Sequence, residues 1–174
     1  MHIRQVSLQY HAEADRLLLR VRSSDDKVFA VWMTRRLCLR LWPHLSAMVQ
    51  HAGAAQAAPH ATPTADAAAM LAASTREQTL AQADFSQPFQ ATAAQQPLGP
   101  EPMLAHVVQL TPQSGGRLQL SISDAQQRNV QLVLDAALGT AVRELMVAAL
   151  RQADWGLALD VAAPGSESSA RLLN

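Results

Sequence analysis

The strongest constraint on the fold is an internal similarity between two segments that lie 101 residues apart in the chain. Residues 16–52 align with residues 117–153 without a gap. The matching apolar pairs are Leu17 with Leu118, Leu19 with Leu120, Val21 with Ile122, Phe29 with Val130, Val31 with Leu132, Met33 with Leu134 and Leu37 with Leu138. Any two segments with the same hydrophobic pattern share some matching apolar pairs, but the unbroken register favours a true duplication. An internal repeat constrains the fold rather than the function.

Each copy has the pattern of strands followed by a helix. In the first copy, Val6, Leu8 and Tyr10 alternate with polar residues, which is typical of a half-buried strand. Residues 16–22 and 28–33 alternate in the same way, and the polar loop between them predicts a hairpin. The predicted cross-strand pairs are Val21 with Phe29, Arg20 with Ala30, Leu19 with Val31, Leu18 with Trp32 and Leu17 with Met33. In the second copy we expect strands around Val108–Leu110, 118–122 and 130–134, a turn at 111–116, and a last strand at 157–161.

A helix is expected after each hairpin, with Thr34 and Asp135 as the residues that cap its first turn. Leu37, Leu41 and Leu45 then form one face of the first helix. Pro43 complicates this assignment, because inside a helix it costs roughly 3 kcal/mol or causes a kink. The alternative is a helix that begins at Trp42 and Pro43. Since the second copy has no proline in this region, the sequence favours a kinked helix beginning at Arg35.

The predicted fold class is therefore α+β, with a duplicated β-β-β-α unit and antiparallel sheets that each pack one helix. The first unit covers residues 1–52, and the second unit with its final strand covers residues 103–161. Between them, residues 53–102 form a long Ala/Gln/Pro-rich linker with a possible helix at 64–85. Residues 162–174 are expected to be a flexible tail. The linker either wraps across the fold or separates two subdomains.

Composition places the chain among globular proteins, because 49% of its 174 residues are hydrophobic and only 16% are charged. The net charge is zero, but residues 1–52 carry a balance of +4 and the remainder a balance of −4. Cys38 is the only cysteine, so no intramolecular disulfide forms, and its leucine neighbours favour a buried thiol over a nucleophile. The start of the chain lacks an apolar signal region, and no apolar run is long enough to span a membrane. We therefore expect a cytoplasmic protein.

The sequence shows no pattern of catalytic, cofactor-binding or metal-binding residues. The six histidines are His2, His11, His44, His51, His60 and His106. None of them has the spacing to another histidine or to Cys38 that metal sites use. No glycine loop for phosphate and no nucleophile-elbow serine is present. The prediction is a protein that is not an enzyme and has no cofactor or metal.

The outer faces of the two expected sheets differ. In the second unit this face carries Gln119, Ser121, Ser123, Asn129, Gln131 and Val133, which is an ordinary solvated surface. In the first unit it carries Leu18, Arg20, Arg22, Val28, Ala30 and Trp32. A linker helix or a second subunit covering this face would explain it. A surface that stacks single-stranded nucleic acid, with Trp32 under a base and arginines on phosphates, would also explain it.

Three further arginines, Arg35, Arg36 and Arg40, follow in the first helix. The helix dipole disfavours Arg35 and Arg36 in the first turn by about 0.3–1 kcal/mol. A partner such as phosphate or an acidic protein would explain their position, but the sequence favours a solvated face or pairing with Asp25, Asp26 or an acidic residue of the second unit. The predicted function is a non-enzymatic protein-interaction or assembly module, binding a second copy or another protein. The alternative is a nucleic-acid-binding regulatory protein that uses the same face. The candidate partner-binding residues are Leu18, Arg20, Arg22, Val28, Trp32, Arg35, Arg36 and Arg40.

Overall fold

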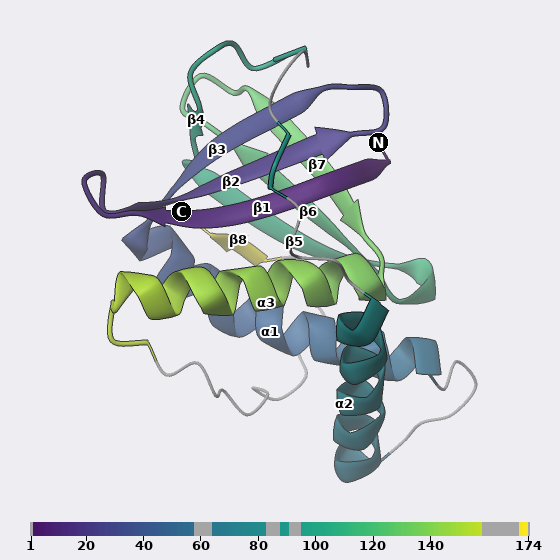
Figure 1. Cartoon of the computed structure of the whole chain (residues 1–174). Helices are drawn as coiled ribbons and strands as arrows, with labels where there is room; N and C mark the ends of the chain where they lie inside the picture. Colours follow the sequence, from purple (N-terminus) through teal and green to yellow (C-terminus); the bar gives the residue numbers. More distant parts are fainter. Residues whose placement is uncertain (1, 58–63, 83–87, 91–94, 158–170, 174) are drawn as a thin grey trace.

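The computed structural model describes residues 2–57, 64–82, 88–90, 95–157 and 171–173 (Figure 1). It is an α+β structure with two sheets. The elements in chain order are β1 (Ile3–His11), β2 (Arg16–Ser23), β3 (Val28–Thr34), α1 (Arg35–Ala57), α2 (Ala65–Gln82), β4 (Met103–Leu104), β5 (Val107–Gln113), the short 3-10 helix η1 (Ser114–Gly116), β6 (Arg117–Ser123), β7 (Asn129–Leu134), α3 (Ala136–Ala153) and β8 (Arg171–Leu173).

The first three strands form an antiparallel meander in the order of the chain, and β4 adds to the edge of β3 in parallel. All five cross-strand pairs predicted for the hairpin of β2 and β3 are confirmed, from Leu17 opposite Met33 to Val21 opposite Phe29. The register follows from hydrophobic alternation, because a shift by one residue would turn the buried side chains of both strands to the outer face.

The second sheet has the order β7-β6-β5-β8, and its hairpin repeats the first: Leu118, Leu120 and Ile122 lie opposite Leu134, Leu132 and Val130. The predicted turn at 111–116 is too long, since β5 continues to Gln113 and only Ser114–Gly116 turn. Pro112 is tolerated in this strand because β8 pairs only with residues 108–110, so the proline lies beyond the stretch paired on both sides.

The two hairpin loops have the same backbone geometry. The side-chain oxygen of Ser23 accepts a hydrogen bond from the backbone N–H of Lys27, and that of Asp124 accepts one from Arg128. Asp26 and Gln127 adopt left-handed backbone angles, with φ of 60° and 63°. Each of these pairs is separated by 101 residues, so the sequence register also holds for the loop conformations.

Helices α1 and α3 begin where the sequence predicts. Helix α1 starts at Arg35 and continues through Pro43, so the alternative start at Trp42 is wrong. The side chains of Thr34 and Asp135 accept hydrogen bonds from the third residue of their helices, Leu37 and Leu138, which confirms both caps.

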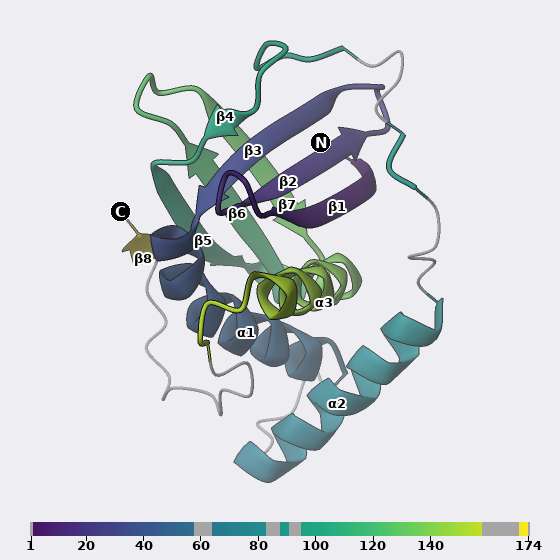
Figure 2. The same cartoon turned by 60° about the vertical axis from the view of Figure 1, so that its left-hand side comes forward.

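The helices are exchanged between the units. Helix α3 of the second unit packs mainly against β1 of the first sheet, and α1 contacts β5, β6 and η1 of the second. Figure 2 shows α1 and α3 side by side below the two sheets. The buried residues of both sheets and both helices form one hydrophobic cluster. The expectation that each sheet packs its own helix is therefore corrected, because the pattern that defines an apolar face does not identify the sheet that covers it.

The region between the units contains α2, which is somewhat shorter than the expected helix at 64–85. It packs on α1 and α3 and then projects away from the body of the protein, and Met70 on it is 75% exposed. Gln95 forms a bridge with Lys27, directly before β3, and residues 103–104 pair with β3 itself. Of the strand expected at 157–161, only Leu157 is among the described residues and it is not in a strand. Within the expected tail, Arg171–Leu173 form β8.

Candidate functional surface

The outer face of the first sheet is built from three rows of side chains across β1, β2 and β3. The strand register places Gln5 beside Arg22 and Val28, Ser7 beside Arg20 and Ala30, and Gln9 beside Leu18 and Trp32. We use "outer face" for these nine residues together with His11. The face presents two guanidinium groups, two side-chain amides and one tryptophan on one surface.

The structure places the eight candidate residues in three different environments. Leu18, Arg22 and Val28 are buried. Arg20 and Trp32 are half-buried, and Arg35, Arg36 and Arg40 on α1 are exposed. Trp32 and the arginines of α1 are therefore accessible at the surface, whereas the three buried residues are covered.

The cover comes from residues 88–90 and 95, which belong to the predicted linker. The guanidinium of Arg22 donates a hydrogen bond of 2.6 Å to the backbone oxygen of Gln90 and is paired with Asp26. The backbone N–H of Val28 donates to the oxygen of Gln95 at 2.7 Å, and the N–H of Gln95 donates to the oxygen of Asp26 at 3.0 Å. One end of the outer face is thus already occupied by the protein's own chain.

Arg20 lies at the centre of this face with its guanidinium held on two sides. Its Nε donates to the hydroxyl of Ser7 at 3.2 Å, and its Nη2 donates to the side-chain oxygen of Gln9 at 2.8 Å. The guanidinium carbon is 4.7 Å from the centre of the Phe89 ring, in a cation–π contact. Burial lowers the pKa of Arg20 from its ordinary value, but a guanidinium stays charged at physiological pH.

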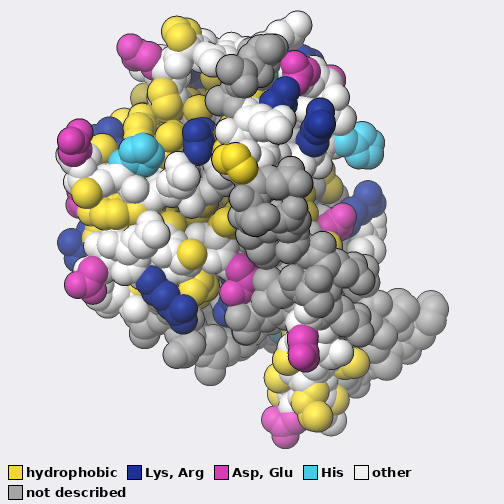
Figure 3. Space-filling model, in the orientation of Figure 1, with side chains coloured by type: hydrophobic (Ala, Val, Ile, Leu, Met, Phe, Trp, Pro, Cys, Tyr) yellow, Lys and Arg dark blue, Asp and Glu magenta, His cyan; other side chains and the backbone are white. Residues whose placement is uncertain are grey.

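At the other end of the face, Gln9 and His11 are exposed, Trp32 is half-buried and Leu18 is buried. Trp32 makes an edge-to-face contact with His11 at 5.0 Å between ring centres, and its backbone oxygen accepts a hydrogen bond from Ala105. Leu104, which pairs with Trp32 across β3 and β4, is 44% exposed. Figure 3 shows hydrophobic side chains gathered over this part of the first sheet, next to basic ones. We call Trp32, Leu104 and His11 the open patch.

The arginines of α1 do not form one uniform group. Arg35 donates a hydrogen bond of 3.2 Å to the backbone oxygen of Trp155, so it ties the start of α1 to the end of α3. Arg36 and Arg40 are exposed on the same helix.

The matching outer face of the second unit has hydrogen bonds between its own polar side chains, from Gln113 to Gln119 and from Asn129 to Ser121.

Sequence reasoning missed Gln5, Ser7, Gln9 and Phe89 as members of this surface. The three β1 residues had a usable signal, because they alternate with the buried residues Val6 and Leu8 and so had to share the face of Arg20. No sequence signal identifies Phe89, since its contact with Arg20 spans 69 residues of chain.

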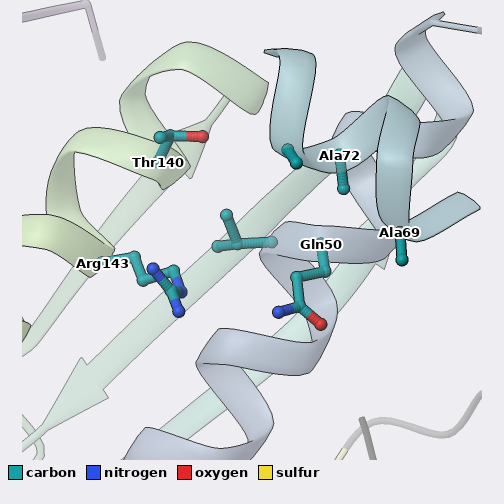
Figure 4. A pocket seen from close by; sticks show the side chains of 7 residues that line it. Gln50, Ala69, Ala72, Thr140 and Arg143 are labelled. Atoms are coloured by element: carbon teal, nitrogen blue, oxygen red, sulfur yellow. The ribbon is translucent and has the colours of Figure 1, made fainter. Parts of the chain in front are cut away.

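A cavity of about 150 Å³ lies where α1, α2 and α3 meet (Figure 4). Its lining includes Gln50, Thr140 and Arg143, together with Ala69, Ala72 and Ala73 of α2. Thr140 donates its hydroxyl hydrogen to the oxygen of Ala136, and Arg143 binds Ser46 and Glu144. Because these polar groups already have partners, the cavity is a poor binding site for a polar ligand.

Cys38 is fully buried, and burial raises the pKa of its thiol to about 12, so the expectation of an inert, buried cysteine is confirmed. Within the described ranges no three His, Cys, Asp or Glu side chains come together in a group that could bind a metal ion. No helix in the same part of the chain is both long and apolar enough to cross a bilayer.

Comparison of the chain with protein-family models, with curated proteins and with solved structures finds no match.

Proposed function

We propose that this protein is a non-enzymatic interaction module that binds another protein chain through the open patch and the exposed start of α1. The observation that carries this proposal is the position of Trp32. It stays half-buried at the surface beside Leu104, although the neighbouring side chains of the same face, Leu18 and Val28, are covered. Tryptophan, together with tyrosine and arginine, is enriched among the residues that anchor binding interfaces.

The difference between the two units supports a binding role for the first. The positions equivalent to Leu18 and Trp32 are Gln119 and Val133 in the second unit. If the units arose by duplication, as their shared register and loop geometry indicate, the first has gained or kept a large apolar side chain where the second has a small one. A solvated sheet needs no tryptophan at this position.

The partner we favour is a second copy of this chain. The protein has a formal net charge of zero, so long-range repulsion between copies is small. The basic start of α1 also belongs to the half of the chain with a balance of +4, while the remainder carries −4.

Nucleic acid is the second candidate, and the exposed Arg36 and Arg40 are the observation that favours it. Its support is weaker, because Arg20 and Arg22 are held by Phe89, Gln90 and Asp26. Contacts to phosphates would be lost steeply as salt rises. Absence of binding to single- and double-stranded nucleic acid at about 50 mM salt would remove this candidate.

The test of the proposed function is the oligomeric state of Trp32→Glu compared with wild type. We expect wild type to associate and Trp32→Glu to sediment as a monomer, with the helical circular dichroism signal unchanged. The equivalent change in the second unit, Val133→Glu, is expected to leave association intact. A wild type that is monomeric at high concentration would contradict self-association.

A further inference from the structure

We propose that the covered end of the outer face is a binding site for an extended peptide that carries an aromatic residue, and that residues 88–90 occupy this site in the isolated protein. The inference rests on the proposed role of the first unit's outer face in binding another protein, and it names the chemistry of a partner. The site consists of Gln5, Ser7, Gln9, Arg20 and Arg22.

The side chain of Gln5 recognises peptide backbone. Its Nε2 donates a hydrogen bond of 3.0 Å to the oxygen of Pro88, and its Oε1 accepts one of 3.0 Å from the N–H of Gln90. In an extended segment, the oxygen of one residue and the N–H of the second residue after it lie on the same edge. One side-chain amide therefore takes the place of a neighbouring strand. These two bonds do not depend on the side chains at positions 88 and 90.

Arg22 adds a third contact to backbone. Its Nη1 donates to the oxygen of Gln90, while Asp26 holds the other side of the guanidinium. Because Asp26 is paired with the guanidinium, it orients Arg22 independently of the segment that is bound. Gln5 and Arg22 therefore bind three polar groups of the segment, and all three belong to its main chain.

The central residue of the segment is recognised by its ring. Phe89 lies over the guanidinium of Arg20, which Ser7 and Gln9 hold in place. Tyrosine or tryptophan would make the same cation–π contact, and an aliphatic residue would not. The site therefore selects an aromatic residue, followed by any residue except proline, which lacks the backbone N–H that Gln5 accepts.

Residues 88–90 are bound as a ligand that another segment can replace. Pro88 and Gln90 are exposed and Phe89 is half-buried, and residues 88–90 contact the side chains of Gln5 on β1 and of Arg20 and Arg22 on β2. The second unit lacks this set, because Val107, Ser121 and Ser123 stand where the first unit has Gln5, Arg20 and Arg22. The occupant we assign is an extended segment of another protein, in competition with residues 88–90.

The experiment uses the full chain with Phe89→Ala and a labelled peptide of the sequence of residues 86–92, followed by fluorescence polarisation. Phe89→Ala weakens the chain's own segment, so the peptide should bind this variant at least tenfold more tightly than it binds wild type. Adding Gln5→Ala should weaken binding at least fivefold, and adding Gln131→Ala on the second unit should not. A peptide with alanine in place of its phenylalanine should not bind.

Three results would overturn the proposal. The first is a folded Phe89→Ala variant that does not bind the peptide at millimolar concentration. The second is a Phe89→Ala variant that loses its helical signal, because a replaceable segment cannot be essential to the fold. The third is a wild-type oligomer that Phe89→Ala dissociates, which would assign the site to a second copy. Loss of association in Trp32→Glu without peptide binding in Phe89→Ala would leave the proposed function standing and reject only this site.

Discussion

The guanidinium carbon of Arg143 lies 5.4 Å from the centre of the Trp42 ring, and the two residues hold the same position in their units, 101 residues apart. This pair lies where α1 and α3 pack against each other. Gly139 supports the close approach of the helices, since a Cβ atom at this position would be 3.4 Å from Val49.

The first prediction is that Trp42 is a principal determinant of stability. It is fully buried, and truncation of a buried tryptophan costs about 3–5 kcal/mol. Trp42→Ala should lower the free energy of unfolding by that amount in urea denaturation. Trp42→Phe should cost less, because the indole N–H has no hydrogen-bond partner among the described residues and its loss is not penalised. A larger loss in Trp42→Phe than in Trp42→Ala would contradict this placement.

The second prediction concerns trypsin cleavage between the units. Arg76 is the only lysine or arginine between Arg40 and Arg117, and it lies in α2 outside the strands and the two exchanged helices. After cleavage at this site, the two fragments should stay together in gel filtration under native conditions, because α3 packs on β1 and α1 packs on β5 and β6. Separation of the fragments without denaturant would show two independent subdomains.

The third prediction concerns the thiol of Cys38. Because burial raises its pKa to about 12, the thiol stays protonated at pH 8, and a thiol-specific reagent should react with it only after unfolding. The rate of modification in native buffer should follow the rate of global or local opening. Fast stoichiometric reaction of the native protein would contradict the burial of this side chain.

The sequence predicted those features of the fold that depend on local pattern. Alternation of apolar residues predicted the register from Leu17 to Val21, and cap residue types predicted the helix starts at Thr34 and Asp135. It did not predict the exchange of helices, because the apolar face of α3 is equally suited to either sheet. It also did not predict how the outer face is covered, since the contacts of Gln5 and Arg22 with residues 88–90 span 68 to 85 residues.

The open patch combines Trp32, a candidate residue from the sequence, with Leu104 and His11, which were not candidates. Trp32 was selected from the pattern of β3, and the structure places it beside Leu104, which sequence reasoning assigned to no surface. The two-residue strand β4 is too short for its side-chain alternation to be recognised. Its parallel pairing with β3 comes from tertiary structure alone.

The most direct test of the interaction module is a comparison of Leu104→Glu with Val133→Glu by sedimentation velocity over a concentration series. The two side chains are matched, with 44% and 43% of their surface exposed, but only Leu104 lies in the open patch. We predict that wild type and Val133→Glu associate with the same dissociation constant, and that Leu104→Glu weakens association at least tenfold. Equal association of all three proteins, or a purely monomeric wild type, would contradict the proposed function.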